Sequence, residues 1–80
     1  FLQGIGLYDG PYVNLKIINN LVSVSSYHGI SVYGARGLRI INNTAVHVFG
    51  ETRQEPWIGG FDSKSGRPST DVVVANNAAM

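Results

Sequence analysis

The sequence predicts an all-β fold in which about three coils of parallel strands are stacked on one another. Two observations predict it: one seven-residue phrase occurs three times, and a second phrase is repeated in step with it. The first phrase reads NLKIINN at 14–20, GLRIINN at 37–43 and DVVVANN at 71–77, so its copies start 23 and then 34 residues apart. Repetition at such intervals is typical of solenoids, in which each repeat forms one coil.

The second phrase adds another strand to each coil. It reads IGLYD at 5–9, ISVYG at 30–34 and IGGFD at 58–62. Apolar residues alternate with other residues in this phrase, and β-branched side chains are common, which is the period-two pattern of a strand. We expect the first and third residues of each copy to point inward, although Gly60 interrupts the apolar pattern.

The first phrase is also expected to be a strand, with its second and fourth residues in the core. These inward residues are Leu15, Ile17, Leu38, Ile40, Val72 and Val74. The return segments 21–29 and 44–50 are rich in β-formers, and no stretch has the spacing of an amphipathic helix. A leucine-rich repeat would need spaced leucines and a helical return segment. A β-sandwich would have no reason to repeat Ile-Ile-Asn-Asn in register, whereas stacked parallel coils would.

The asparagine pair that ends each phrase predicts a corner of the coil. Asparagine tolerates the left-handed backbone of a tight bend. Asparagines that lie above one another can also form amide-to-amide hydrogen bonds along the stack. We therefore expect Asn20, Asn43 and Asn77 to form a stacked column at a turn.

These repeats resemble those of the right-handed parallel β-helix (pectin-lyase-like) proteins, in which short strands are punctuated by Asn-Asn before a sharp corner. The resemblance covers nearly the whole chain and implies a β-solenoid of about three coils. It leaves the activity open, because this architecture carries lyases, hydrolases, epimerases and phage tailspikes. The chain starts at Phe1 and stops at Met80 within a repeat, so we expect 1–80 to be a single β-helix segment of a longer protein, with flanking coils as partners.

Composition excludes several classes of partner. Six basic and five acidic residues give a net charge of +1, and neither sign forms a run, which argues against a nucleic-acid partner. No apolar run reaches the roughly 18 residues of a membrane span. The absence of cysteine is neutral with respect to compartment. The resemblance implies an extracellular, cell-surface or virion-associated location.

Three aromatic residues, Tyr8, Tyr33 and Phe61, are expected to form one outward column. Small residues flank that column, so the rings could form a platform for the rings of a sugar, and we predict carbohydrate binding there. The alternative is that the stacked rings only stabilise the sheet through cross-strand pairing.

The loops that follow this column differ in length between coils, which is where a solenoid builds a site. Asp9, Arg36 and Asp62 are expected on this edge, and Lys64 and Arg67 could reach over it. Lyases and epimerases of this architecture need a cation or Arg/Lys to neutralise a uronate carboxylate, together with a base for the C5 proton. Arg36 is therefore also a candidate sugar ligand. A cation such as calcium would suit that chemistry, but no residue pattern indicates a cofactor. The alternative is that these charges only solvate the turns.

Two histidines could act as acid or base near neutral pH. His28 and His47 do not occupy equivalent repeat positions, so no metal site is predicted, and His28 is expected to hydrogen-bond at a corner. The candidate catalytic residues are thus Asp9, His28, Arg36 and Asp62. The insertion 51–57 is predicted to be a polar loop that covers a surface or caps the core with Trp57. The sequon at Asn42 is not expected to be glycosylated, because its asparagine is assigned to the buried corner.

The sequence therefore predicts a β-helix segment of a protein that acts on or adheres to polysaccharide. As an enzyme it would be a lyase, epimerase or hydrolase of acidic glycans. The competing function is a non-catalytic adhesin or phage tailspike, commonly a homotrimer, and the third is a purely structural segment.

Overall fold

The computed structural model describes residues 4–25, 28–48 and 56–80, and all the regular structure in these ranges is β-strand. The strands are β1 (Ile5–Leu7), β2 (Tyr12–Ile18), β3 (Leu21–Val24), β4 (His28–Tyr33), β5 (Ala35–Ile41), β6 (Thr44–His47), β7 (Trp57–Phe61), β8 (Thr70–Ala75) and β9 (Ala78–Ala79). Both repeated phrases therefore form strands, as predicted. The first halves of the return segments 21–29 and 44–50 also form strands.

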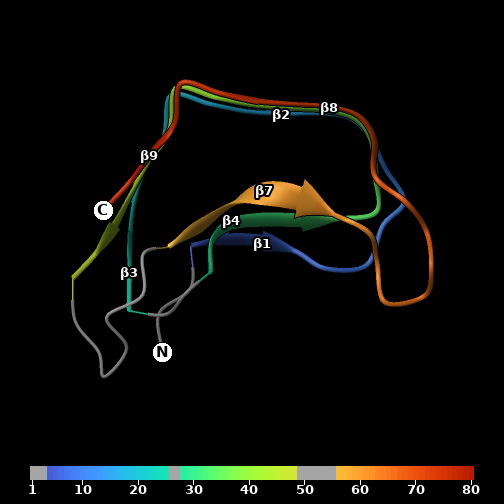
Figure 1. Ribbon diagram of the computed structural model, residues 1–80, viewed down its shortest axis with the longest axis horizontal. Coiled ribbons are helices and arrows are strands. Elements are labelled where there is room, and N and C mark those ends of the chain that lie inside the picture. Colours follow the sequence, from blue (N-terminus) through green and yellow to red (C-terminus); the bar gives the residue numbers. More distant parts are fainter. Residues whose placement is uncertain (1–3, 26–27, 49–55) are drawn as a thin grey trace.

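The strands form three parallel sheets, ordered β1-β4-β7, β2-β5-β8 and β3-β6-β9. Each passage of the chain contributes one strand to each sheet and then returns above its starting point, so three solenoid-like turns overlie one another (Figure 1). Ile5 pairs with Ile30, Leu15 with Leu38, and Leu38 with Val72, all in parallel. These pairs confirm the register that the repeated phrases predict.

The asparagine corner is formed as predicted, with one correction to how its two residues are used. Asn20 donates from its backbone N and Nδ2 to Asn43 Oδ1, at 2.9 and 3.0 Å. Asn43 donates from the same two atoms to Asn77 Oδ1, also at 2.9 and 3.0 Å. The left-handed backbone, however, lies at the preceding residue of each pair: φ is 59° at Asn19, 57° at Asn42 and 56° at Asn76. The first asparagine of each pair therefore makes the bend, and the second builds the ladder.

A second left-handed column, not predicted from the sequence, lies five residues earlier in each repeat. Asn14, Gly37 and Asp71 begin the three copies of the first phrase and have φ values of 54°, 75° and 52°. Asparagine, glycine and aspartate are the residues that adopt this conformation most readily. The residue type at the first position of each phrase is thus explained by the left-handed backbone and not by a role of its side chain at the surface.

Replacing Asp71 with alanine is expected to lower the free energy of unfolding by about 1–2 kcal/mol, because alanine pays the steric cost of the left-handed backbone. Asp71→Gly should cost only the exposed ion pair that Asp71 makes with Arg39, at most about 1 kcal/mol. Urea unfolding followed by Trp57 fluorescence would measure both. Equal losses in the two variants would contradict the role of backbone geometry at this position.

The core is a single cluster of inward side chains between the sheets. Ile30, Val32, Leu38 and Ile40 in the middle turn are fully buried, and Ile17 is 6% exposed. Gly60, which interrupts the apolar pattern, points at this core: a Cβ there would lie 2.7 Å from Leu38 Cδ2, so glycine leaves room for that leucine. The prediction that Val74 is buried is wrong. It is 42% exposed, because β8 belongs to the last turn and has a neighbour on one side only.

Most of the inserted loop predicted at 51–57 lies outside the described residues. Its last residue, Trp57, begins β7 and is 41% exposed. Trp57 therefore belongs to a sheet rather than to a cap on the core.

Candidate functional site

The outer face of the β1-β4-β7 sheet carries the predicted aromatic column. The rings of Tyr8 and Tyr33 have centroids 5.5 Å apart and planes inclined by 35°, and those of Tyr33 and Phe61 are 5.1 Å apart and inclined by 31°. Each ring thus contacts the ring of the next turn. Such pairs stabilise the sheet and at the same time form a continuous aromatic strip along the stack.

A second column, formed by His28 and Trp57, faces the first one on the same sheet. Their ring centroids lie 5.7 Å apart, His28 lies 5.7 Å from Tyr8, and Trp57 lies 6.4 Å from Phe61. With Tyr33 these residues form a closed cluster of five rings, hereafter the aromatic face. Sequence reasoning compared His28 with His47 and missed the pairing with Trp57. The signal was hidden because a bulge at His28/Ile30 shifts the register, so His28 precedes Ile30 by two residues whereas Trp57 directly precedes Ile58.

Small residues between the two columns leave room for the aromatic rings to pack directly against the strands. A Cβ on Gly6 would collide with the Tyr8 ring, and a Cβ on Gly59 would lie 3.1 Å from Phe61 Cζ. Ser31, in the same column, is fully buried, and its Oγ lies 3.1 Å from His28 Nδ1. The small residues are thus covered by rings instead of forming an open track beside them. The hydrogen bond to Ser31 orients the His28 imidazole and occupies Nδ1.

A hollow of about 190 Å³ opens beside this cluster and is lined by Tyr8, His28, Tyr33 and Lys64. Lys64 comes from the long loop between β7 and β8, so a residue of that loop and residues of two successive turns meet here. The hollow brings an ammonium group next to aromatic rings and an imidazole. Of the predicted site residues, Tyr8, Tyr33 and His28 line it, and Phe61 packs against Tyr33.

The long loop is held in place by its own polar residues. Ser69 Oγ donates to Phe61 O at 2.6 Å and accepts from the backbone N of Gly34 and Ala35 at 3.1 and 3.0 Å. Asp62 Oδ1 accepts from Ser69 N at 3.2 Å. Arg67 Nη1 reaches back across the stack and donates to Gly10 O at 2.6 Å. Asp62 and Arg67, which were expected at the site, therefore each make a hydrogen bond that helps to hold the loop.

Arg36 lies apart from the aromatic face. It lines a second hollow, of about 230 Å³, together with Pro11, Gly34, Arg67, Pro68 and Thr70. Among the described residues no ion pair joins Arg36 to Asp9 or Asp62. The three charged residues expected to lie near one another thus form no ion pair, and the predicted site residues line two separate hollows, one at the aromatic face and one at the corner.

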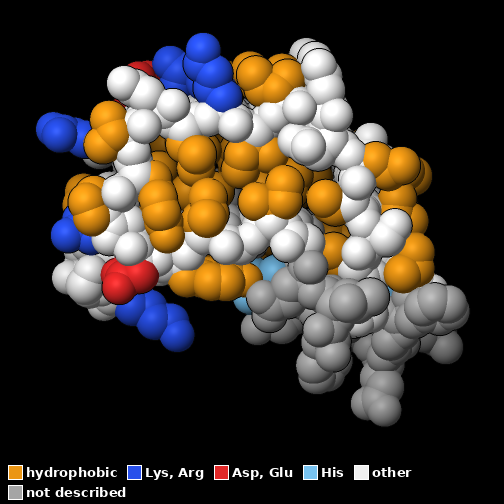
Figure 2. All heavy atoms as spheres, turned by 180° about the vertical axis from the view of Figure 1, so that it is seen from behind, with side chains coloured by type: hydrophobic (Ala, Val, Ile, Leu, Met, Phe, Trp, Pro, Cys, Tyr) orange, Lys and Arg blue, Asp and Glu red, His pale blue; other side chains and the backbone are white. Residues whose placement is uncertain are grey.

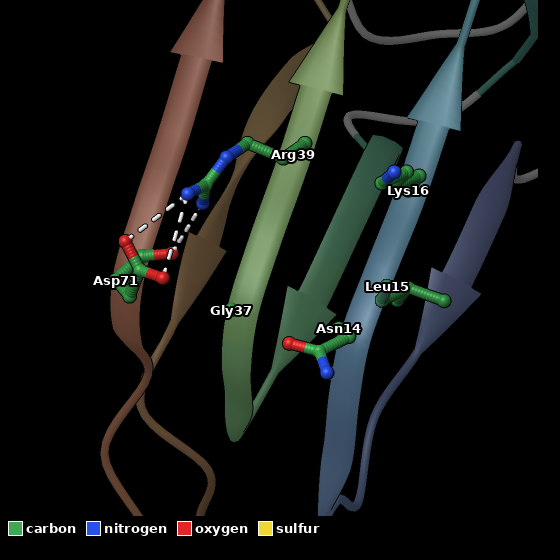
Figure 3. A pocket seen from close by; sticks show the side chains of 6 residues that line it. All are labelled: Asn14, Leu15, Lys16, Gly37, Arg39 and Asp71. Carbon is green, nitrogen blue, oxygen red and sulfur yellow. Dashed lines mark hydrogen bonds and ion pairs between the residues drawn. The ribbon is translucent and has the colours of Figure 1, made fainter.

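The ion pair that the described residues do form lies on another sheet. Arg39 Nη2 lies 3.2 Å from Asp71 Oδ1, and Arg39 Nη1 donates to the Asp71 carbonyl at 2.8 Å. These residues line a hollow of about 400 Å³ over the second left-handed column, and Figure 3 shows the Arg39 side chain turned toward Asp71 on the neighbouring strand. Because both side chains are partly exposed, this pair contributes little to stability.

His47 and His28 lie on different sheets. His47 is in register with the buried Val24, and its Nε2 is buried without a hydrogen-bond partner in the described part of the chain. In the same ranges no group of three or more His, Asp or Glu side chains could hold a metal ion. Asn42 corrects the reasoning on the sequon, since it is exposed on the outside of the corner and only Asn43 is buried.

Comparisons of the chain with models of protein families, with curated proteins and with solved structures found no match. Within the described residues there is no helix with the length and apolar character needed to cross a membrane.

Proposed function

We propose that the chain is a segment of a right-handed parallel β-helix of the pectin-lyase-like kind, and that its aromatic face binds polysaccharide. The observation that carries the proposal is a hollow on the β1-β4-β7 sheet that is lined by Lys64 and three rings of the five-ring aromatic face. The parallel stacking and the Asn-Asn corner support the fold assignment, because both recur in register in all three turns. An extracellular or virion-associated location is part of the same proposal.

The chemistry of the hollow fits an acidic glycan. Aromatic rings offer apolar surface to the C–H faces of a sugar, and a few polar groups then fix its orientation. Tyr8, which is 43% exposed, supplies such a surface at the rim. Lys64, at the same rim, carries the charge that attracts a carboxylate. A chain of uronic acids presents an apolar ring face and a carboxylate on every residue, which is the combination this hollow would recognise.

Binding without turnover is the form of the proposal that the loop edge favours. Lyase or epimerase chemistry would need a base and a neutralising cation at one reacting carbon. Asp62 instead accepts from Ser69 N, Arg67 donates to Gly10 O, and Arg36 lies in a separate hollow. We therefore propose that this is an adhesin-like or tailspike-like binding surface, in preference to the active site of an enzyme.

Lys64→Ala is expected to weaken binding of an oligogalacturonate about five-fold or more, since a partly desolvated charge-assisted hydrogen bond contributes about 1 kcal/mol or more. Lys16→Ala is the matched control, because it removes the same charge from the exposed surface of β2. Tyr33→Ala should weaken both the oligogalacturonate and a neutral glucan oligosaccharide, if both bind. Arg36→Ala tests the corner hollow separately. Calorimetry at low ionic strength would measure all four variants.

Three results would count against the proposal: an oligogalacturonate that does not bind, equal losses in Lys64→Ala and Lys16→Ala, or binding that is unchanged in Tyr33→Ala. Release of shortened or unsaturated products from the oligosaccharide, lost in His28→Ala, would replace the non-catalytic function with an enzymatic one.

A further inference from the structure

The corner hollow is lined by two cationic side chains and by no carboxylate. Arg36 and Arg67 line its space of about 230 Å³, and the described residues around it include no Asp or Glu. Arg36 lies in β5, whereas Arg67 lies in the long loop that precedes β8. Figure 2 shows Lys and Arg side chains along the edge of the molecule that carries this corner, on the left of the view. A hollow lined by charges of one sign attracts a ligand of the opposite sign.

Arg67 is held in position by the protein itself. Its backbone N donates to Ser63 Oγ at 3.0 Å, and its carbonyl accepts from Ser63 N at 2.8 Å. Ser63 is only 6% exposed, so this anchor is buried. The side chain then crosses the corner beside Gly34, where a Cβ would lie 3.5 Å from Arg67 Cδ, and its Nη1 donates to Gly10 O. Within the described residues, Arg67 Nε and Nη2 have no hydrogen-bond partner, so these donors remain available to a ligand.

Arg36 brings a second guanidinium to the same hollow. It is exposed and in register with Thr70, its neighbour on β8, which is also exposed and also lines the hollow. Residues in register on adjacent parallel strands project to the same face, so the Thr70 hydroxyl lies beside the Arg36 side chain. Asp71, which follows Thr70, forms its ion pair with Arg39 instead. In the described ranges Arg36 forms no ion pair, and its donors are therefore also available.

We infer that the corner hollow binds a tetrahedral divalent oxyanion, the sulfate or phosphate group of a ligand, between Arg36 and Arg67. A guanidinium presents paired N–H donors that match two oxygens of one anion. One such fork satisfies a planar carboxylate, whereas two forks and the Thr70 hydroxyl can engage the additional oxygens and the second charge of a sulfate or phosphate group. The inference is independent of the proposed function, because the corner hollow and the hollow at the aromatic face share no lining residue.

Titration of the chain with sodium sulfate tests for the site, with the ionic strength held constant by sodium chloride so that general screening does not change. The NMR signals of the Arg36 and Arg67 Nε–H groups should shift along one saturating curve. The Nε–H signal of Arg39, which is paired with Asp71, should not follow that curve. Shifts that rise without saturation, or an equal response at Arg39, would overturn the inference, because they would show only a general attraction of anions to the surface.

Further anions test which chemistry the hollow selects. Inorganic phosphate should bind as sulfate does, whereas acetate should bind about five-fold or more weakly, because it offers one charge and two oxygens. Glucose 6-sulfate and glucose 6-phosphate then show which of the two groups is preferred, and a preference for either supports the inference. Acetate that binds as tightly as sulfate would overturn it.

Matched substitutions test the two arginines. Arg36→Ala should weaken sulfate binding about five-fold or more, because charge-assisted hydrogen bonds are lost. Arg36→Lys should weaken it by less, since lysine keeps the charge but not the fork. Arg67→Lys tests the second fork and keeps a cation in the loop that Arg67 helps to hold. Arg39→Ala is the matched control and should leave binding unchanged. The strand amide signals in each spectrum check that the variant is folded. Sulfate binding that is unchanged in Arg36→Ala, or equal losses in Arg36→Ala and Arg39→Ala, would overturn the inference.

Discussion

Asn43→Ala is expected to lower the free energy of unfolding by about 2–5 kcal/mol, because the substitution leaves buried polar groups without partners. Asn43 is 1% exposed, and both polar atoms of its side chain form hydrogen bonds. Its Nδ2 donates to Ile17 O at 2.9 Å and to Asn77 Oδ1 at 3.0 Å, and its Oδ1 accepts twice from Asn20. Among the three ladder asparagines it is the one with a rung on each side, so its loss interrupts the ladder in the middle.

The adjacent Asn42 supplies the matched control for this prediction. It is exposed and has a φ of 57°, so Asn42→Gly should be tolerated to within about 0.5 kcal/mol, since glycine adopts that backbone readily. Equilibrium urea unfolding at one fixed protein concentration would compare the two variants. If Asn43→Ala unfolded at the same urea concentration as Asn42→Gly, the ladder would not be what holds the corner.

Ile40→Ala is expected to cost about 2–5 kcal/mol of stability, because the cavity it leaves cannot collapse. Ile40 is fully buried in the middle turn, between Ile17 below and Val74 above in the same column. The backbone on both sides is held by the parallel ladder, so neighbouring side chains cannot move along the stack to fill the space.

Ile41→Ala makes the same chemical change one residue later, where the side chain points outward and is only half-buried. It should cost roughly 1 kcal/mol or less, because less apolar surface returns to water and no enclosed cavity forms. Thermal unfolding of both variants at one concentration gives the comparison. A larger loss in Ile41→Ala than in Ile40→Ala would mean that the assignment of inward and outward residues in β5 is wrong.

The candidate site was predictable only in part. The column of Tyr8, Tyr33 and Phe61 follows from the repeat, because a parallel register places equivalent residues one above another. The pairing of His28 with Trp57 does not follow from the repeat, because the two residues occupy different repeat positions. The bulge at His28/Ile30 shifts the register and so brings them into one column. The contacts of the edge charges do not follow from the sequence for a related reason. A loop without a repeated counterpart takes its shape from its own hydrogen bonds, which engage Asp62 and Arg67.

The sequence by itself determined the features that recur in every turn. Alternation in the strands, the Asn-Asn corner and the offsets between phrases each constrain a residue against its equivalent in the next turn, so they determine the parallel register. The tertiary structure alone decided how the rings lie back over Gly6, Ser31 and Gly59, and where Lys64 meets them. The tertiary structure also leaves Val74 exposed, although Val74 occupies a repeat position that is buried in the middle turn. The physical reason is the same in each case: a repeat specifies contacts between equivalent residues, whereas exposure at an end and contacts of a unique loop depend on neighbours that the repeat does not contain.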